Sequence, residues 1–283
     1  QYFLGEIVRF FTQNDHSVIH YGKGSGSMRY SALVLAAGSG QRMKLGYNKV
    51  FYELENGKTV LDQALSVFKE DDRCKQIVLV CSTNDIVRIS SQYVSGKVVV
   101  VLGGATRQES VYNGLKAVHE ENVLIHDGAR PWISKKNVDA LLEKLAEHPA
   151  CILMVPAKDT VKVVEKGIIK ETLQRERLWL AQTPQAFDTR LIISCYKRAM
   201  DLGIQATDDA QVVELTCDMP VLCVKGSYDN IKITTKEDLK GLHDRTESSL
   251  QNSKDDFFLQ WKQILQIWTD RKQKDVKPGF LPA

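Results

Sequence analysis

The sequence predicts an α/β protein with a mostly parallel, Rossmann-like sheet flanked by helices and a projecting β-hairpin arm. Three observations lead to this prediction. Short apolar runs alternate with stretches of helical periodicity, which is typical of parallel strand–helix–strand units. Glycines or acidic residues follow several of these runs, where ligand sites in parallel sheets lie. The alternation stops near residue 160, where two apolar runs flank a glycine-containing turn.

The expected strands are short apolar runs, and the expected helices carry apolar residues on one face. We expect strands over 32–35, 76–81, 97–102, 123–126 and 151–156, and helices over 60–68, 107–119 and 135–145. Strands joined in this way run parallel, so their carboxyl ends meet at one edge of the sheet. Gly38, Gly103, Gly104, Asp127 and the segment 158–160 should therefore converge there.

A β-hairpin is expected where the alternation breaks. Runs 160–164 and 168–173 flank the turn Glu165-Lys166-Gly167. A two-stranded ribbon alone is marginally stable in water, and a second subunit is the simplest cover for it. We therefore expect an arm near 160–175 that forms a homodimer.

Both ends read as additions to a main domain spanning 28–246. Residues 1–27 close with the glycine- and serine-rich stretch 22–27, a flexible linker composition that suits a tag, a mis-set start or a genuine extra segment. Residues 247–283 form a helical tail by periodicity, with apolar side chains at Phe257, Trp261, Ile264, Leu265 and Trp268.

Composition excludes several classes of protein. The net charge of +3 is too small to indicate nucleic-acid binding. No apolar run approaches the length of a membrane span, and the N-terminus lacks a secretory pattern. The six cysteines contain no C-x-x-C pair, so we expect buried free thiols in a reducing cytoplasm rather than a zinc or redox site.

A glycine turn after the first strand indicates phosphate binding. Ala36-Ala37-Gly38-Ser39-Gly40 is followed by Arg42 and Lys49. Backbone N–H groups in such a turn can point at phosphate oxygens, and the two cations add full positive charges. Met43 occupies the third glycine position of a dinucleotide fingerprint, and no P-loop is present. An ordinary strand–loop–helix turn with surface cations is the alternative.

From residue 33 to 239 the chain resembles the 2-C-methyl-D-erythritol 4-phosphate cytidylyltransferase family. The matching segments are 36–43 with Lys49, 103–111, 126–131, 156–162, Arg175 with Trp179 and 182–187, 207–210, and 229–234. The resemblance implies a nucleotide-diphospho-sugar-transferase-like fold. It also implies transfer of CMP from CTP to 2-C-methyl-D-erythritol 4-phosphate, giving CDP-methylerythritol and pyrophosphate in the non-mevalonate isoprenoid pathway.

The resemblance also implies roles for individual residues. The catalytic positions are Arg42, Lys49, Arg175 and Lys232. The CTP-binding positions are Ala36, Ala37, Gly38, Ser39, Gly40, Gly104, Ser110 and Asp127. The polyol phosphate would contact Arg130, Thr160 and Thr183. Asp127 would serve Mg²⁺ or another divalent cation, directly or through water, because hard cations prefer oxygen ligands. His126 is read as a packing residue.

At two positions the sequence differs from the pattern of its relatives. Position 105, often acidic in relatives, is Ala105, which leaves the base contacts open. Many nucleotidyltransferases place proline before the catalytic lysine, whereas this chain has Asn48. We expect this change to alter loop stiffness more than chemistry.

Three other functions remain open from the sequence. A sugar-1-phosphate nucleotidyltransferase is a weaker alternative, because it would leave the cytidine-type segments unexplained. A ribitol-5-phosphate cytidylyltransferase shares the fold, CTP and most of the cations. A non-catalytic nucleotide-binding protein is the alternative from another class, but it should have lost Arg42, Lys49, Asp127 or Lys232, and all four are present.

Overall fold

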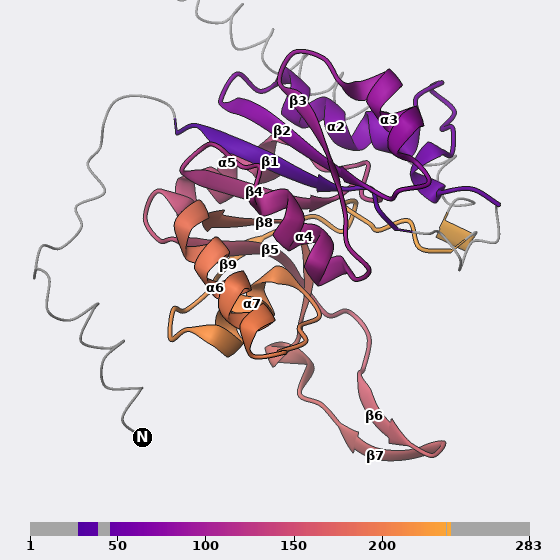
Figure 1. Cartoon of the computed structure of the whole chain (residues 1–283). Helices are drawn as coiled ribbons and strands as arrows, with labels where there is room; N and C mark the ends of the chain where they lie inside the picture. The colour runs from indigo at the N-terminus through magenta and orange to yellow at the C-terminus, as the bar shows by residue number, and fades with distance from the viewer. Residues whose placement is uncertain (1–27, 39–45, 236, 239–283) are drawn as a thin grey trace, which may run out of the picture.

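A seven-stranded sheet forms the centre of the molecule, in the order β3-β2-β1-β4-β8-β5-β9 (Figure 1). The computed structural model describes residues 28–38, 46–235 and 237–238. The strands of this sheet are β1 Tyr30–Leu35, β2 Cys74–Cys81, β3 Val98–Leu102, β4 Asn122–Asp127, β5 Ala150–Pro156, β8 Trp179–Asp188 and β9 Leu222–Lys225. β8 is antiparallel to both of its neighbours, and the other pairs are parallel. The predicted mostly parallel sheet is confirmed.

Helices cover both faces of this sheet. They are α2 Val60–Glu70, α3 Ile86–Tyr93, α4 Arg107–Leu115, α5 Lys135–Leu145, α6 Thr189–Asp201 and α7 Asp209–Thr216, with single 3₁₀ turns η2 Lys49–Phe51 and η3 Arg175–Arg177. Capping residues set several starts: Thr59 begins α2 with a capping box to Asp62, and Ser134 begins α5.

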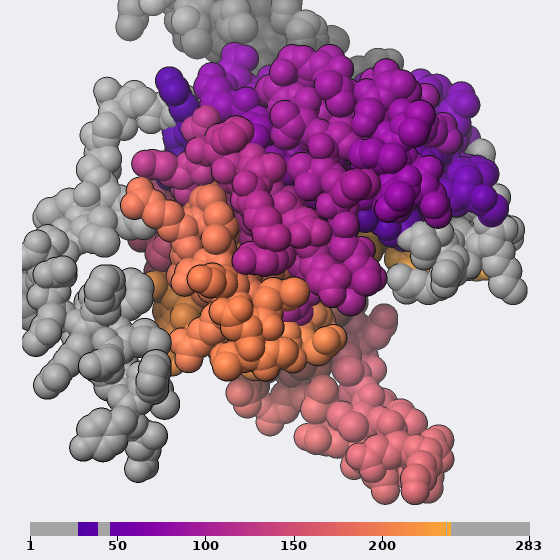
Figure 2. Space-filling view, in the orientation of Figure 1, coloured from indigo at the N-terminus to yellow at the C-terminus, as the bar shows by residue number. Residues whose placement is uncertain are grey.

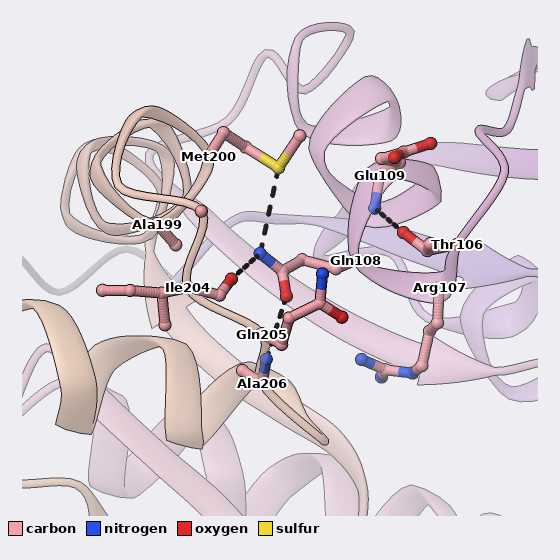
Figure 3. Close-up of a pocket in the computed structure, with 10 residues that line it drawn as sticks. Thr106, Arg107, Gln108, Glu109, Ala199, Met200, Ile204, Gln205 and Ala206 are labelled. Carbon is pink, nitrogen blue, oxygen red and sulfur yellow. Dashed lines mark hydrogen bonds between the residues drawn. The ribbon is translucent and has the colours of Figure 1, made fainter.

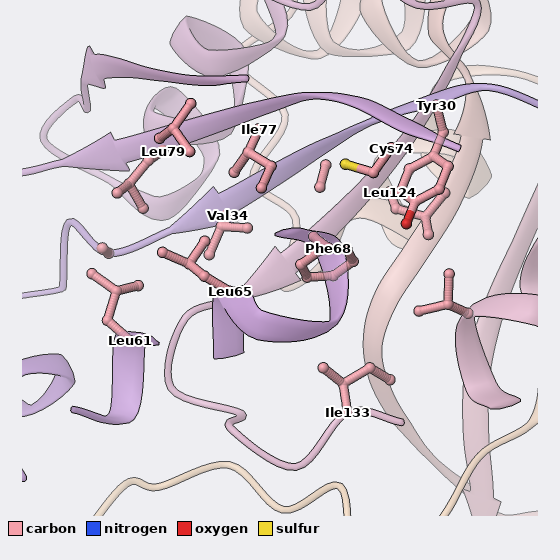
Figure 4. Close-up of a cluster of buried hydrophobic side chains, with 14 of the residues drawn as sticks. Tyr30, Val34, Leu61, Leu65, Phe68, Cys74, Ile77, Leu79, Leu124 and Ile133 are labelled. Atoms are coloured by element: carbon pink, nitrogen blue, oxygen red, sulfur yellow. The ribbon is translucent and has the colours of Figure 1, made fainter. Parts of the chain in front are cut away.

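Alternation along the buried strands divides the core into two layers. On one face Val34, Leu79 and Leu124 pack against α2, α3 and α5, as Figure 4 shows around Leu65 and Phe68. On the other face, neighbouring strand residues such as Leu33 and Val80 pack against α4, α6 and α7. Successive side chains of a strand point to opposite faces, so one strand supplies both layers.

The helix predicted over 107–119 ends earlier, at Leu115. Gly114 weakens its last turn, and the next N–H groups form i→i+3 bonds, from Ala117 to Gly114 and from Val118 to Leu115. The His119 N–H then donates to Gln76 Oε1 at 3.0 Å, which directs the chain toward β4.

The hairpin arm is confirmed as an element, with β6 Lys162–Glu165 paired to β7 Ile168–Thr172. The predicted three-residue turn is wrong by one residue: Glu165 pairs with Ile168, which leaves Lys166 and Gly167 as the turn. Both have positive φ, 49° and 78°, as a type I′ turn requires. The arm extends away from the body in Figures 1 and 2. Its exposed apolar side chains include Val164, Ile168 and Ile169. Dimerisation through it stays a prediction.

Other sequence expectations have mixed outcomes. All six cysteines are free, but Cys217 is half-buried and Cys223 exposed, so burial holds for four of them. Within the described ranges, every helix is too short or too polar to cross a bilayer. The expected extension 1–27 and tail 247–283 lie outside the described residues.

Candidate active site

Lys49 lies on a short turn beside the carboxyl edge of the sheet. Lys49 is the first residue of η2, and its Nζ donates to the carbonyl oxygen of Ile233 at 2.6 Å. Residues 49 and 233 are far apart in sequence, so this bond brings the glycine-turn region next to the segment that carries Lys232. Ala36, Ala37 and Gly38 follow β1 at the same edge. Ser39, Gly40 and Arg42, three further predicted site residues, lie outside the described residues.

The loop after β3 meets the glycine turn. A Cβ added at Gly103 would stand 3.0 Å from Ala37 Cβ and 2.7 Å from Ser110 Oγ, so only glycine lets these backbones approach so closely. Ser110 is buried; its Oγ accepts from the Gly104 N–H at 3.0 Å and donates to the Thr106 carbonyl at 2.8 Å. Glu109 accepts from the Ala105 N–H at 2.7 Å. Side chains of the first turn of α4 thus hold the loop in shape.

Asp127 is the centre of a charged cluster at the end of β4. Lys232 Nζ lies 2.7 Å from its Oδ2, and Arg107 Nη2 lies 3.7 Å from its Oδ1. Arg130 Nε lies 4.0 Å from Oδ2. Burial alone would raise the pKa of Asp127, but Arg107, Lys232 and Arg130 hold that pKa well below its usual range. The carboxylate is therefore ionised, and three cations gather around one anion.

Thr183 connects this cluster to the buried layer behind it. Its Oγ1 accepts from the Asp127 N–H at 3.0 Å and lies 3.0 Å from His126 Nδ1. Asn230 donates to the Thr183 carbonyl at 2.8 Å, and Arg130 donates to the Asn230 carbonyl at 2.7 Å. Fully buried His126 also packs edge-on against Phe68, which fits its predicted packing role.

Two buried polar atoms in this network lack a hydrogen-bond partner within the described residues: Arg130 Nε and Asn230 Oδ1. An unpaired buried donor or acceptor costs free energy, so such groups are rare in folded proteins. Arg130 Nε has the Asp127 carboxylate as its nearby opposite charge, at 4.0 Å.

Arg175 and Thr160 lie elsewhere in the chain. Thr160 is exposed between β5 and the arm, and Arg175 is exposed where the arm returns to the body. The Arg175 guanidinium donates to the Lys158 carbonyl at 3.3 Å. The fold brings to one edge the predicted residues Ala36, Ala37, Gly38, Lys49, Gly104, Ser110, Asp127, Arg130, Thr183 and Lys232. Within the described residues, no hydrogen bond or ion pair joins Arg175 or Thr160 to the Asp127 cluster.

A hollow lined in part by Arg107 lies between the start of α4 and the loop after α6 (Figure 3). Gln108 occupies its floor; its Nε2 donates to the Ile204 carbonyl at 2.9 Å, and its Oε1 accepts from the Ala206 N–H at 3.0 Å. Because these polar groups already form hydrogen bonds with one another, we interpret the hollow as a place where α4 packs against the loop after α6.

Three residues with clear roles in the site were missed as site residues by sequence reasoning. Arg107 makes a two-pronged bond to Asp209, at 3.0 and 2.8 Å, while reaching toward Asp127. Arg107 and Asp209 both belong to segments that match the family, and this match is the sequence signal that could have found them.

Asn48 is the third such residue, which the sequence marks only as a replacement for proline. Its φ of −66° is the value a proline would fix, yet its side chain also donates to the Ala36 carbonyl at 2.7 Å. This bond ties the loop to the end of β1, and the expectation that the change alters loop stiffness more than chemistry stays a prediction.

The chain matches known proteins over most of its length. A family model for 2-C-methyl-D-erythritol 4-phosphate cytidylyltransferase matches residues 30–243. A protein of that name from Halalkalibacterium halodurans is 45% identical over 217 residues, covering 75% of this chain and 94% of the relative. Another from Shouchella clausii is 46% identical with the same coverage.

Solved structures give the same result. 4-Diphosphocytidyl-2C-methyl-D-erythritol synthase from Anaerococcus prevotii is 35% identical, with a TM-score of 0.68 over 78% of this chain and 97% of that one. The cytidylyltransferase from Thermus thermophilus is 29% identical, with a TM-score of 0.65 over 76% and 98%. The chain therefore belongs to the 2-C-methyl-D-erythritol 4-phosphate cytidylyltransferase family.

Proposed function

We propose that this chain carries out its family's reaction, the transfer of CMP from CTP to 2-C-methyl-D-erythritol 4-phosphate, at the edge that holds Lys49, Asp127 and Lys232. A phosphate oxygen of the polyol phosphate forms a bond to the α-phosphorus of CTP. The bond from that phosphorus to the α–β bridging oxygen breaks, and pyrophosphate leaves. The products are CDP-methylerythritol and pyrophosphate.

The attacking oxygen is already ionised, so the enzyme needs no general base. The difficulty is bringing two polyanions together, which is a task of positioning and charge stabilisation. The observation that carries the proposal is the cluster of Lys232, Arg107 and Arg130 around Asp127, with Lys49 tied to the neighbouring Ile233 carbonyl.

Each cation has a proposed role. Lys49, with Arg42 from the glycine turn, stabilises the charge that develops at the α-phosphorus, and Lys232 holds the phosphate of the polyol. Loss of one such preorganised contact typically costs about a hundred- to thousandfold in rate. Ala36, Ala37, Gly38, Ser39 and Gly40 cradle the triphosphate. Gly104 and Ser110 face the nucleoside, and Arg130 and Thr183 contact the polyol phosphate.

Mg²⁺ or another divalent cation fits this arrangement. Within the described residues no three His, Cys, Asp or Glu side chains gather as a metal cage. Magnesium usually takes one or two carboxylates together with substrate phosphates, so a single ionised Asp127 is a suitable donor. When bound, the cation would neutralise triphosphate charge and favour departure of pyrophosphate. Asp127 would hold it, directly or through water.

The arm provides the proposed contact between two copies of the chain. Val164, Ile168 and Ile169 are more than half exposed on an isolated two-stranded sheet, and a second copy would cover them. In such a homodimer, Arg175 and Thr160 would complete the partner's site.

We place the enzyme in the cytoplasm, where reducing conditions suit its six free thiols.

Pyrophosphate release tests the function. The enzyme is assayed with CTP and Mg²⁺ against 2-C-methyl-D-erythritol 4-phosphate, ribitol 5-phosphate and sugar 1-phosphates. We expect release with the methylerythritol substrate only, and its loss on chelation of the metal. Release with ribitol 5-phosphate alone would replace the substrate and keep the reaction class, whereas no release with any acceptor would reject the function.

A further inference from the structure

Asn48 is buried immediately before Lys49, with only 6% of its surface exposed. Its Nδ2 carries two hydrogens, and both are used: one goes to the Ala36 carbonyl at 2.7 Å and the other to Asp85 Oδ2 at 3.0 Å. Its Oδ1 accepts from the Val50 N–H at 3.3 Å. One side chain therefore links three backbone or side-chain groups from three parts of the chain.

Asp85, which accepts the second of these bonds, is itself held in place. It precedes α3, and Ser82 also donates to its Oδ2, at 2.8 Å. Two more contacts hold α3 to its neighbours, one to Phe51 in the Lys49 turn and one to Thr59, which caps α2. The Arg88 guanidinium lies 3.8 Å from the centre of the Phe51 ring, and the Tyr93 and Thr59 hydroxyls are 3.3 Å apart. The loop after β2 and the start of α3 thus form a firm support for the Lys49 turn.

A simple capping role does not account for this arrangement. Capping of η2 uses only the bond from Val50 to Oδ1, and η2 is three residues long. The two shorter bonds point away from η2, to the end of β1 and to α3. They connect the residue immediately before Lys49 to Ala36, where the predicted triphosphate cradle starts, and to Asp85.

We propose that Asn48 and Asp85 are positioning residues for the reaction: Asn48 fixes the distance between the glycine turn and Lys49, and Asp85 holds Asn48 in place. This inference rests on the proposed function, since it assigns Lys49 to the transition state. The Lys49 amine must meet charge that appears only as the α-phosphorus is attacked, so its placement affects kcat more than the binding of CTP. A displacement of about 1 Å in such a group can cost about a hundredfold in rate.

Asn48→Asp is the sharpest test because it conserves shape. It removes both donated bonds and places a carboxylate against that of Asp85. We expect kcat to fall by roughly a hundredfold with a much smaller change in the KM for CTP. Exchanging the pair, in Asn48→Asp with Asp85→Asn, restores a donor between the two positions and should recover at least about tenfold of that loss. Asn137→Ala is the matched control: it removes an equally buried asparagine near the start of α5, and kcat should be unchanged.

The coupling to Lys49 separates positioning from general support of the fold. In a Lys49→Ala background, Asn48→Asp should lower kcat by less than about tenfold more, since effects of residues that act as a unit are not additive. Thermal unfolding of each variant checks that the fold persists. A near-wild-type kcat for Asn48→Asp, or a full hundredfold loss in the Lys49→Ala background, would overturn the inference. If the wild-type enzyme itself turned over no acceptor, the proposed function would fail instead.

Discussion

At the scale of single residues, His126 is fully buried and packs between Phe68 and Thr183. Burial lowers its pKa to about 4, against an ordinary value near 6.5. It is therefore neutral in the folded protein at physiological pH. Its neighbour Asp127, also buried, remains charged because cations surround it. Burial disfavours the charged form of both residues. It prevails at His126, where Asp127 opposes it but Arg130 adds to it, whereas Arg107, Lys232 and Arg130 together outweigh it at Asp127.

His126 should make stability depend on pH. Between pH 6.5 and 4 the unfolded chain binds a proton at this residue and the folded protein does not, so stability falls as pH falls through this window and the loss levels off below it. From pH 7 to 5 the loss is about 2 kcal/mol. We expect His126→Gln, which does not titrate, to lose about 2 kcal/mol less than wild type over that range, measured by urea unfolding.

Asp71 acts outside this window. Burial alone would raise the pKa of Asp71, but its salt bridge to Arg73 lowers that pKa to about 2. The contribution of Asp71 to the stability of the fold is therefore lost only at still lower pH. An unchanged pH slope in His126→Gln would contradict the assignment to His126.

At the scale of elements, one carboxylate joins three helices. Asp209, in the first turn of α7, is fully buried; it receives the Arg107 guanidinium from α4 and the Tyr196 hydroxyl from α6. Asp208 caps α7 and accepts from Gln185 of β8 at 2.9 Å. The helices on this face are therefore tied to each other and to the sheet beside Asp127.

Asp209→Asn should be strongly destabilising because it leaves Arg107 without its closest counter-charge. Breaking a buried ion pair costs about 3–5 kcal/mol. Because Arg107 is partly exposed, we expect the free energy of unfolding to fall by about 3 kcal/mol. Urea unfolding measures it. Lys144→Ala, which breaks an exposed pair with Glu147, is the control and should leave stability unchanged. Equal stabilities of the two variants would show that Asp209 has no such role.

At the scale of the whole molecule, the sequence predicts the first five strands because each is an apolar run, and their shared direction explains why Gly38, Gly104 and Asp127 meet. β8 is not predicted, since its stretch Gln182-Thr183-Pro184-Gln185 lacks apolar alternation. The side chains of Gln182, Thr183 and Gln185 are nevertheless buried, each with a hydrogen-bond partner. The Lys232–Asp127 pair is likewise beyond local pattern, because residues 127 and 232 meet only after β8 and β9 have joined the sheet. Family resemblance, not periodicity, indicated Lys232.

The arm gives the largest-scale prediction, since Arg175 does not reach the Asp127 cluster of its own chain. If two copies share sites, each site takes Lys49 from one subunit and Arg175 from the other. Mixing Arg175→Ala and Lys49→Ala subunits then rebuilds one intact site in every heterodimer. Random pairing makes half of the dimers mixed, so about one quarter of wild-type turnover should return. The measurement is pyrophosphate release after the inactive variants have been co-refolded.

A matched mixture makes this test specific. Lys49 and Lys232 lie on the same side of the proposed division, because Lys49 contacts the Ile233 carbonyl within one chain. Lys49→Ala mixed with Lys232→Ala should therefore recover nothing, since every site keeps one defect. If the Arg175→Ala mixture were equally inactive while co-purification of differently tagged subunits showed mixed dimers, Arg175 would serve its own subunit. Recovery in the Arg175→Ala mixture alone would place Arg175 across the dimer contact, and the arm would then be part of the active site as well as of the interface.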